Sequence, residues 1–258
     1  MKTVLTIAAS DPSGGAGIQA DLRAIGAHGL YGMAVPTALT IQNTLGVTGV
    51  HVPPAEILAA QLRSVLSDIL PDAVKIGAVP GAAHAQVVAG LLNEFHARNI
   101  VFDPVLASTS GADLGTVEAA AILAPSVVLL TPNLPEAAKL LGLAPDSIRS
   151  ADDMVSAADA LARKFGTAVL LKGGHRPDGA FDDYLRLPGG DGEWFPTRAA
   201  HSAGGNHGTG CLLSSSIACG LAVGLTMRES IRRAKERLSD ALDRGLVLGH
   251  GNGPVDFR

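Results

Sequence analysis

A short glycine-containing segment before a small-residue helix has the clearest chemical potential in this sequence. It consists of Gly208, Thr209, Gly210 and Cys211, and the run that follows predicts a helix from Leu212 onward. The first amides of a helix lack intrahelical acceptors and lie at the positive end of its dipole. Glycines let an anion approach such amides closely, so this segment can hold an oxyanion or a phosphate. A glycine-rich turn before a tightly packed helix is the alternative interpretation.

Cys211 falls in the first turn of the predicted helix, where the positive helix end favours a thiolate. The thiol is therefore a candidate base, and a buried inert cysteine is the alternative. Cys219 lies eight residues further along the same helix. Two such positions are about 12 Å apart, which is too far for a disulfide. Unpaired cysteines fit a reducing compartment, so we expect a cytoplasmic protein.

Polar or glycine residues follow several predicted strands where each strand ends. The strands are predicted over Thr3–Ala9, Gly32–Leu39, Ala73–Gly77, Ile100–Asp103, Ser126–Thr131 and Ala168–Lys172. The residues at or just beyond their ends are Asp11, Gln42, Gly77, Asp103, Asn133 and Lys172. Helices predicted between these strands indicate βαβ units and a mostly parallel sheet. The carboxyl ends of parallel strands share one edge, where ligands bind, so we expect these residues and the 208–211 segment to lie together.

The remaining elements complete a single α/β domain that we expect to span residues 1–258. Helices are predicted over Ala16–His28, 53–69, Ala82–Arg98, Val117–Leu123, Leu134–Leu141, Ala151–Phe165 and Met227–Leu248. Thr40–Thr48 is predicted to be a polar loop, followed by a short strand near Val50. Phe181–Arg198 alternates and contains two glycines, which predicts an antiparallel hairpin at the sheet edge. We expect helices on both faces of the sheet.

Several of the polar residues allow two interpretations. The N-x-x-E pattern of Asn133 and Glu136 before an apolar run is typical of a capping box, and proline suits the first turn. The same oxygens can hold a magnesium ion or its waters beside a phosphate. Asp103 can bind metal or satisfy a turn. Lys172 can neutralise a phosphate as a point charge, or simply lie at the sheet edge.

The polar loop residues are also ambiguous. Gln42 can donate and accept hydrogen bonds at once, which suits an aminopyrimidine edge, although a loop glutamine is usually solvated. His175 and His207 are expected to be hydrogen-bonding loop residues, because no two histidines have metal-ligand spacing. The glycine pattern of residues 15–20 fits a dinucleotide fingerprint. That fingerprint needs an acidic residue about 20 positions later, and residues 22–55 contain none, so we reject it.

Composition argues against nucleic-acid and membrane partners. The 258 residues are 47% hydrophobic, 17% charged and 3% aromatic, with a net charge of −4. Neither a basic patch nor base-stacking aromatics indicate nucleic-acid binding. No stretch reaches the ~18 consecutive apolar residues of a membrane span. The apolar run at the N-terminus is short and ends in a turn of the predicted fold, so we expect no signal peptide.

Eight segments, taken in order, resemble one family. They are DPSGGAGIQADL (11–22), TALTIQNTLGV (37–47), DAVKIG (72–77), DPVLASTSG (103–111), TPNLPEA (131–137), LLKGGH (170–175), HGTGC (207–211) and GHGNGPV (249–255). Together they resemble the hydroxymethylpyrimidine/phosphomethylpyrimidine kinases of thiamine biosynthesis, which have a ribokinase-like fold. The resemblance implies magnesium-dependent transfer of the γ-phosphate of ATP to 4-amino-5-hydroxymethyl-2-methylpyrimidine, and then to its monophosphate. It also implies a homodimer.

The resemblance implies a role for each site residue. The anion cradle would be Gly208, Thr209 and Gly210, with Cys211 as the base. The pyrimidine would contact Gln42, Asp11, Ala16, Gly77 and Val105. ATP would contact Lys172, Asn133 and Gly208. Magnesium would be held by Asp103, Asn133 and Glu136.

The sequence departs from the family pattern at a few positions, which leaves substrate choice and nucleotide contacts open. Ala78-Val79 stands where the family commonly has Met-Leu, Leu106 where it often has Met, and Leu212 where Thr is usual. Three other functions therefore stay in view. They are a pyridoxal kinase, a thiol hydrolase or acyl transferase with Cys211 as nucleophile and His207 as base, and a non-catalytic pyrimidine-binding regulator.

Overall fold

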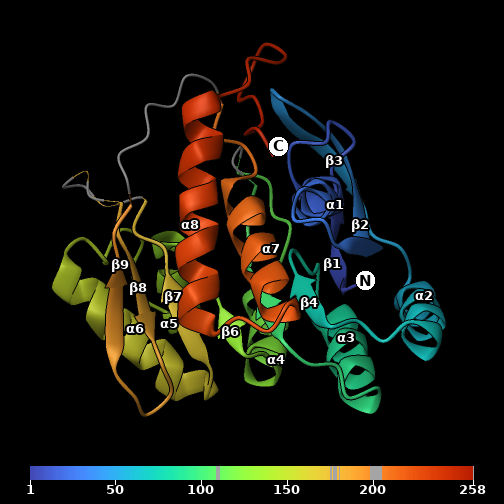
Figure 1. Ribbon diagram of the computed structural model, residues 1–258, viewed down its shortest axis with the longest axis horizontal. Helices are drawn as coiled ribbons and strands as arrows, with labels where there is room; N and C mark the ends of the chain where they lie inside the picture. Colours follow the sequence, from blue (N-terminus) through green and yellow to red (C-terminus); the bar gives the residue numbers. More distant parts are fainter. Residues whose placement is uncertain (109–110, 175, 177–178, 180, 198–204, 258) are drawn as a thin grey trace.

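A nine-stranded sheet forms the centre of the computed structural model (Figure 1), which describes residues 1–108, 111–174, 176, 179, 181–197 and 205–257. The strand order is β3-β2-β1-β4-β5-β6-β7-β8-β9. The strands are β1 (Thr3–Ser10), β2 (Tyr31–Asn43), β3 (Gly46–His51), β4 (Ala73–Ile76), β5 (Ile100–Phe102), β6 (Leu129–Leu130), β7 (Ala168–Leu171), β8 (Asp183–Arg186) and β9 (Gly192–Phe195).

The sheet is parallel in its middle and antiparallel at both edges. Six neighbouring strands run parallel to one another, in the order β2, β1, β4, β5, β6 and β7. At one edge β8 and β9 form the antiparallel hairpin predicted within residues 181–198. At the other edge β3 pairs antiparallel with β2. The mostly parallel ribokinase-like sheet is thus confirmed, with a second antiparallel edge that was not predicted.

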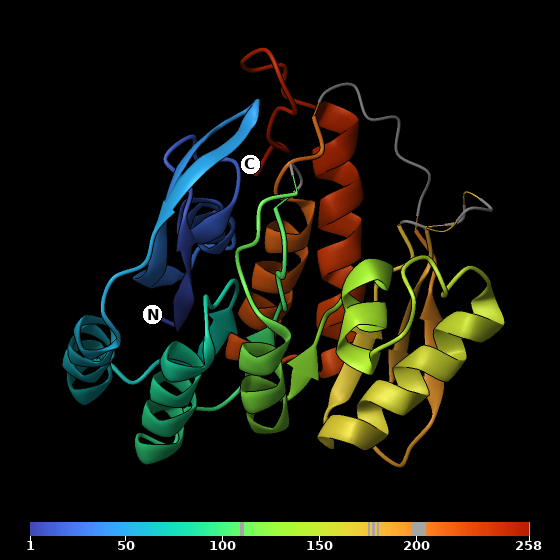
Figure 2. The ribbon, with the colours of Figure 1, turned by 180° about the vertical axis from the view of Figure 1, so that it is seen from behind.

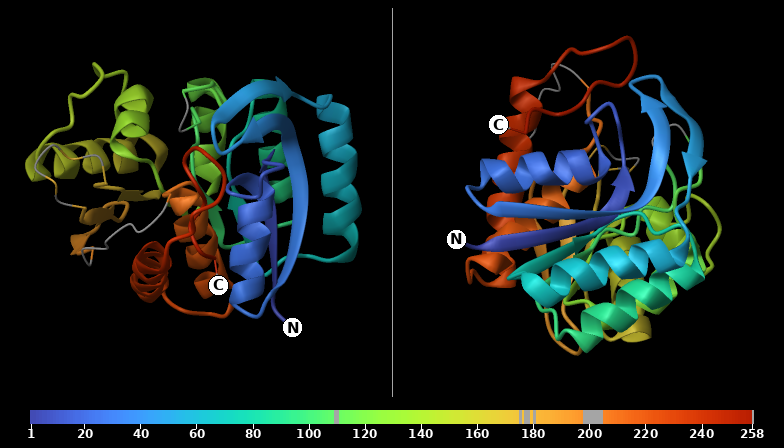
Figure 3. Two further views of the ribbon diagram at one scale, coloured as in Figure 1. Left: turned by 90° about the horizontal axis from the view of Figure 1, so that it is seen from above. Right: turned by 90° about the vertical axis from the view of Figure 1, so that its right-hand side faces the viewer.

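Helices cover both faces of the sheet, as predicted. Helices α1 (Gly17–Ala27), α7 (Thr209–Ala222) and α8 (Met227–Arg244) lie over one face, toward the viewer in Figure 1. The opposite face carries α2 (Ala55–Asp68), α3 (Ala82–Glu94), α4 (Val117–Leu123), α5 (Leu134–Leu141) and α6 (Ala151–Phe165), seen in Figure 2. Figure 3 shows the sheet between these two layers. Alternating strand side chains supply a core on each side, for example Leu5 toward α2–α6 and Val4 toward α7.

The largest error of the sequence analysis concerns Thr40–Thr48, which is not a loop. Strand β2 continues to Asn43, and β3 begins at Gly46. At the end of β2 the usual burial pattern is reversed: Leu39 and Ile41 are exposed, whereas Thr40 between them is buried. The polar face is turned inward because it faces polar residues of the sheet edge, where the Thr40 hydroxyl contacts the backbone of Ser10.

Several element boundaries also differ from the prediction. The strand predicted over 126–131 is reduced to β6, preceded by a 3₁₀ turn over Ala124–Ser126. Helix α3 ends at Glu94 and α8 at Arg244, each four residues early, and α7 begins at Thr209 rather than Leu212. Within the described ranges, no helix combines the length and apolar character needed to cross a lipid bilayer.

Candidate active site at the amino end of helix α7

The glycine loop before α7 is packed against the turn that precedes α1. Gly208, the N-cap residue of α7, has a φ of 87°, a left-handed conformation that favours glycine. A Cβ at this position would lie 2.0 Å from the carbonyl oxygen of Gly15, so no larger residue fits without backbone movement. Gly208 also offers no side chain to cap the helix. The Thr209 amide donates to the Asn206 carbonyl at 3.4 Å. The next amides, those of Gly210 and Cys211, need another acceptor, as an anion cradle requires.

Gly210 lies beside the ends of two strands. A Cβ on Gly210 would lie 3.1 Å from the Asp103 Oδ2 atom and 3.4 Å from the Lys172 Nζ atom. Lys172 donates to Asp103 Oδ1 at 2.8 Å, and the hydroxyl of Thr131 lies 3.3 Å from the same oxygen. The structure therefore brings the predicted nucleotide-side lysine, the predicted acidic strand-end residue and the glycine loop to one place.

Asn133 and Glu136 complete the charged cluster, a name we use for Asp103, Asn133, Glu136 and Lys172. They form the predicted capping box of α5: the backbone N–H of each donates to the side chain of the other at 2.8 Å. Burial raises the pKa of Glu136 to about 7, with Asp103 adding to the rise and Lys172 opposing it. Burial opposes protonation of Lys172, but Asp103 and Glu136 outweigh it and hold the lysine pKa above its ordinary value.

The charged cluster supplies oxygen donors of the kind magnesium prefers. Asn133 Oδ1 and Glu136 Oε2 are occupied by backbone amides, and Asp103 Oδ1 by Lys172. Asp103 Oδ2 faces Gly210. No group of three His, Cys, Asp or Glu residues with metal-binding geometry occurs in the described part of the chain. The residues therefore fit a magnesium ion that keeps most of its ligands as waters and phosphate oxygens, and do not form an all-protein cage.

On the other side of the glycine loop lies a hydrogen-bonded cluster, a name we use for Asp11, Ala16, Gln42 and His207. Asp11 Oδ2 accepts from the Ala16 backbone at 2.8 Å and lies 3.1 Å from His207 Nε2. Asp11 Oδ1 accepts from the backbone and hydroxyl of Ser13. Burial acts to raise the pKa of Asp11, but the hydrogen bonds from His207, Ser13 and Ala16 outweigh it and lower the pKa.

Gln42 reaches the same cluster from β2. Its Nε2 atom lies 3.1 Å from His207 Nε2, and its Oε1 atom lies 3.0 Å from the Thr40 hydroxyl. The structure therefore brings three predicted pyrimidine-contacting residues, Asp11, Ala16 and Gln42, around one imidazole. The sequence predicts that His207 forms loop hydrogen bonds, which it does, and the hydrolase alternative makes it a base; its position at the centre of this cluster is not predicted by either. Its place immediately before Gly208 was the available signal. His175 lies outside the described residues.

Cys211 occupies the predicted first turn, but its environment differs from the expectation. The side chain is buried, with 9% exposed. Burial raises the thiol pKa to about 11, although Lys75 and a hydrogen bond from the Gly17 backbone act to lower it. The prediction that a thiolate is favoured here is therefore wrong: loss of hydration outweighs Lys75 and the Gly17 amide. The same finding, with His207 Nε2 directed at Asp11, argues against a ready nucleophile–base pair.

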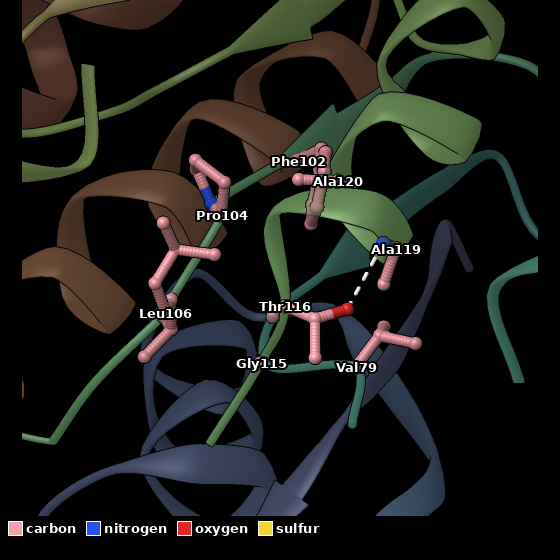
Figure 4. Close-up of a pocket in the computed structure, with 10 residues that line it drawn as sticks. Val79, Phe102, Pro104, Leu106, Gly115, Thr116, Ala119 and Ala120 are labelled. Carbon is pink, nitrogen blue, oxygen red and sulfur yellow. Dashed lines mark hydrogen bonds between the residues drawn. The ribbon is translucent and has the colours of Figure 1, made fainter. Parts of the chain in front are cut away.

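The last two predicted pyrimidine contacts, Gly77 and Val105, line a small pocket shown in Figure 4. Its lining contains no charged side chain and consists of Gly77, Val79, Phe102, Pro104, Val105, Leu106, Gly115, Thr116, Ala119 and Ala120. Thr116 caps α4 there by accepting from the backbone of Ala119 at 3.0 Å. Val105 also packs against a cluster that includes Ala78, where the family commonly has methionine. The wall of this region therefore combines apolar side chains such as Phe102 and Leu106 with small residues such as Gly77 and Ala119.

Comparison with known proteins assigns these features to a family. The family model described as phosphomethylpyrimidine kinase matches residues 11–256. The hydroxymethylpyrimidine/phosphomethylpyrimidine kinase of Salmonella typhimurium is 42% identical over 257 residues, covering 97% of this chain and 95% of that protein. The chain spans only 34%, 33%, 52% and 46% of four longer thiamine biosynthesis proteins that it also matches.

Two solved structures extend the comparison. The phosphomethylpyrimidine kinase of Clostridium difficile superimposes with a TM-score of 0.80 at 36% identity, covering 93% of this chain and 99% of that one. The pyridoxal kinase of Staphylococcus aureus in complex with AMP-PCP and pyridoxal gives a TM-score of 0.89 at 31% identity, covering 100% and 93%. The shared fold therefore spans kinases of two different vitamin precursors.

Proposed function

Because this chain belongs to the phosphomethylpyrimidine kinase family, we propose that it transfers the γ-phosphate of ATP to 4-amino-5-hydroxymethyl-2-methylpyrimidine and then to the resulting monophosphate. One domain spanning residues 1–258 would carry out both steps. The use of ATP accords with the AMP-PCP complex of the related pyridoxal kinase. The phosphotransferase class that the sequence predicts is that of the family.

The observation that supports this proposal most strongly is the position of Gly210. It places the uncapped amides of α7 next to Lys172 and Asp103, at the edge where the parallel strands end. Phosphoryl transfer depends mainly on positioning and charge stabilisation, and backbone amides at a helix N-terminus with a lysine beside them supply both. In this proposal the amides of Gly208–Cys211 face the negative charge that develops on the transferred group.

The chain's own residues then divide the work. Lys172 offsets the charge of the triphosphate, while the hydrogen-bonded cluster orients the pyrimidine. Asp103, Asn133 and Glu136 would hold magnesium, which when bound neutralises phosphate charge. As the hydroxymethyl oxygen bonds to the γ-phosphorus, its proton passes to the Cys211 thiolate and the bond to the β-phosphate oxygen breaks, releasing ADP. The raised thiol pKa makes this thiolate scarce at neutral pH but strongly basic.

Replacing the thiol tests the assignment of Cys211. We expect Cys211→Ala to lower kcat about 100-fold or more, with a small change in KM, because the proton acceptor acts in the transition state. ADP release dependent on the pyrimidine is the measurement. Cys219→Ala is the matched control: it also removes a buried thiol of α7 and should leave kcat near that of the parent. A kcat for Cys211→Ala within about threefold of the parent would show that the thiol is not the base.

Pyridoxal is a second acceptor to consider, because the pyridoxal kinase structure superimposes over the whole chain. Ala78, where the family commonly has methionine, packs with Val105 in the same cluster, so this position differs between this chain and the family pattern. Values of kcat/KM for the two alcohols, measured side by side, separate the alternatives. ADP formation without pyridoxal but with the aminopyrimidine would also exclude a non-catalytic regulator. The homodimer implied by the resemblance and the cytoplasmic location expected from the unpaired cysteines remain predictions.

A further inference from the structure

A buried ion pair lies beneath the glycine loop. Lys75, on β4, and Asp21, on α1, are both fully buried, and Lys75 Nζ lies 2.9 Å from each Asp21 oxygen. The sequence offered one signal for it, a lysine within the apolar strand DAVKIG. A buried ion pair seldom stabilises a fold more than apolar residues of the same volume would, so its presence needs another explanation.

Four elements meet at this pair. Asp21 Oδ2 accepts from the hydroxyl of Thr6 on β1, and Asp21 Oδ1 accepts from the hydroxyl of Ser215 on α7 at 2.8 Å. With the two contacts from Lys75, every hydrogen-bonding position of the carboxylate is used. The ammonium group is therefore fixed relative to α7, and it has no freedom to reach solvent.

The pair lies one helical turn from the Cys211 sulfur. Cys211 and Ser215 are four residues apart and therefore lie on the same face of α7. Gly17 and Asp21 are likewise four residues apart on the same face of α1. The Gly17 amide hydrogen-bonds the Cys211 sulfur, and Ser215 hydrogen-bonds Asp21. Helices α1 and α7 thus contact each other in two successive layers, the thiol in one and the ion pair in the next.

The charges that face the sulfur come from three elements and differ in sign. Lys75 of β4 favours a negative sulfur, whereas Asp21 of α1 and Asp103 beyond β5 oppose it, and the effect of Lys75 is larger than that of either carboxylate. Burial alone acts to lower the pKa of Lys75, but Asp21, Cys211 and Asp103 hold it above its ordinary value. The lysine therefore remains a cation at neutral pH.

We propose that Lys75, oriented by Asp21, is a positioning residue whose fixed positive charge stabilises the Cys211 thiolate. The proposal deepens the assignment of Cys211 as the base and rests on it for its catalytic meaning. The electrostatic effect itself can be measured without substrate. That measurement is unaffected if the base assignment fails, as an active Cys211→Ala enzyme would show, or if the protein transfers no phosphate to the pyrimidine.

The test is the rate at which iodoacetamide alkylates Cys211 in a Cys219→Ala background, because only the thiolate reacts. The variant is Lys75→Met with Asp21→Asn, which removes both charges and lets Asn accept from Ser215. We expect alkylation at pH 8 to slow about tenfold, equivalent to a rise of one unit in the thiol pKa. The matched control neutralises a different buried pair, Lys235 and Asp183, whose charged atoms are 2.6 Å apart. The alkylation rate of Cys211 in this control should stay within twofold of the parent rate.

The direction in which the alkylation rate changes distinguishes an electrostatic role of the ion pair from a structural one. If the pair served only to hold α7, its removal would loosen the helix, expose the sulfur and accelerate alkylation. A rate that is unchanged or faster in a folded variant would overturn the proposal, with folding checked by circular dichroism and thermal unfolding. Lys75→Leu with Asp21→Asn is a second neutral pair for the same measurement if the first does not fold.

Discussion

The two clusters on either side of the glycine loop shift the pKa of a buried carboxylate in opposite directions. In the hydrogen-bonded cluster, Asp11 accepts from Ser13, Ala16 and His207, and its pKa is lowered despite burial. In the charged cluster, burial dominates at Glu136 and raises the pKa to about 7, even with Lys172 close by. The number of donors aimed at a carboxylate, rather than the presence of one cation, decides its charge.

This difference suggests a division of labour. A carboxylate whose hydrogen-bonding positions are filled by its own protein has few free positions to accept from a ligand. Asp11 therefore fixes the conformation of the loop around it. The carboxylates of the charged cluster have fewer donors than Asp11: Glu136 accepts from the backbone of Asn133 and Leu106, and Asp103 Oδ1 from Lys172 and Thr131. Asp103 Oδ2, which faces Gly210, is therefore the oxygen to which a cation would add a partner. Changes in the charged cluster should therefore act on chemistry and on ionisation, and changes in the other cluster on substrate affinity.

The strongest test of this division is Lys172→Met. We expect kcat/KM for ATP to fall about 1,000-fold, because a positive charge beside Gly210 is lost where negative charge develops. The measurement is the steady-state rate with ATP varied and pyrimidine saturating. Lys139→Met, at an exposed position of α5, is the matched control and should leave the rate unchanged. A fall of less than fivefold in the Lys172 variant would contradict the assignment of chemistry to the charged cluster.

A second test uses the ionisation of Glu136. Its pKa in the folded protein, about 7, lies above the ordinary value of 4.5. The protonated form therefore favours folding below pH 4.5, and this contribution is lost as the pH rises through 7. Glu136→Gln cannot ionise, and its side-chain oxygen can still accept from Asn133. The difference between the pKa values of 7 and 4.5, at about 1.4 kcal/mol per unit, gives the variant a free energy of unfolding about 3 kcal/mol higher at pH 8, with little difference near pH 4.

Urea unfolding of the ligand-free protein in the presence of a chelator measures this effect. Glu118→Gln, at an exposed position in the first turn of α4, is the control that removes a carboxylate from a solvated site. Equal stabilities of the Glu136 variant and its parent at pH 8 would mean that the carboxylate is compensated in the folded protein, and the contrast with Asp11 would disappear.

The sequence was sufficient to predict the charged cluster, and the reason is topological. Asp103, Asn133 and Lys172 each follow a strand, and parallel strands bring their ends to one edge whatever the intervening helices do. The capping box at Asn133 could likewise be predicted from local spacing alone. Such residues are placed by rules that need no knowledge of side-chain contacts.

The hydrogen-bonded cluster and the thiol needed the structure. Gln42 lies on a strand whose polar face points inward, and a rule that assigns polar runs to loops cannot detect this. Gln42 and His207 are 165 positions apart in the sequence, so no local signal indicates their contact. For Cys211, the helix end and burial act in opposite directions, and only the packing of α1 and β4 decides which prevails.

The smallest expected effect concerns His207, and its geometry fixes the direction. Its Nε2 atom is within reach of both Asp11 and Gln42. An ionised Asp11 can only accept, so we assign the proton to Nε2. The Gln42 side-chain oxygen then accepts from the imidazole, and its amide nitrogen donates to the Thr40 hydroxyl. This exchanges the two ends of the Gln42 amide relative to the contacts given above.

His207→Leu would remove the hydrogen bonds that the imidazole makes with Asp11 and Gln42. Asp11 would lose one hydrogen bond and Gln42 would lose the partner that orients its amide, at a cost of about 1.4 kcal/mol. We therefore expect KM for the pyrimidine to rise about tenfold while kcat changes less than threefold. His207→Gln keeps a donor and should recover most of the affinity, whereas a purely steric role against Gly15 would not distinguish the two variants. A fall in kcat with KM unchanged would assign His207 to the chemistry of the charged cluster instead.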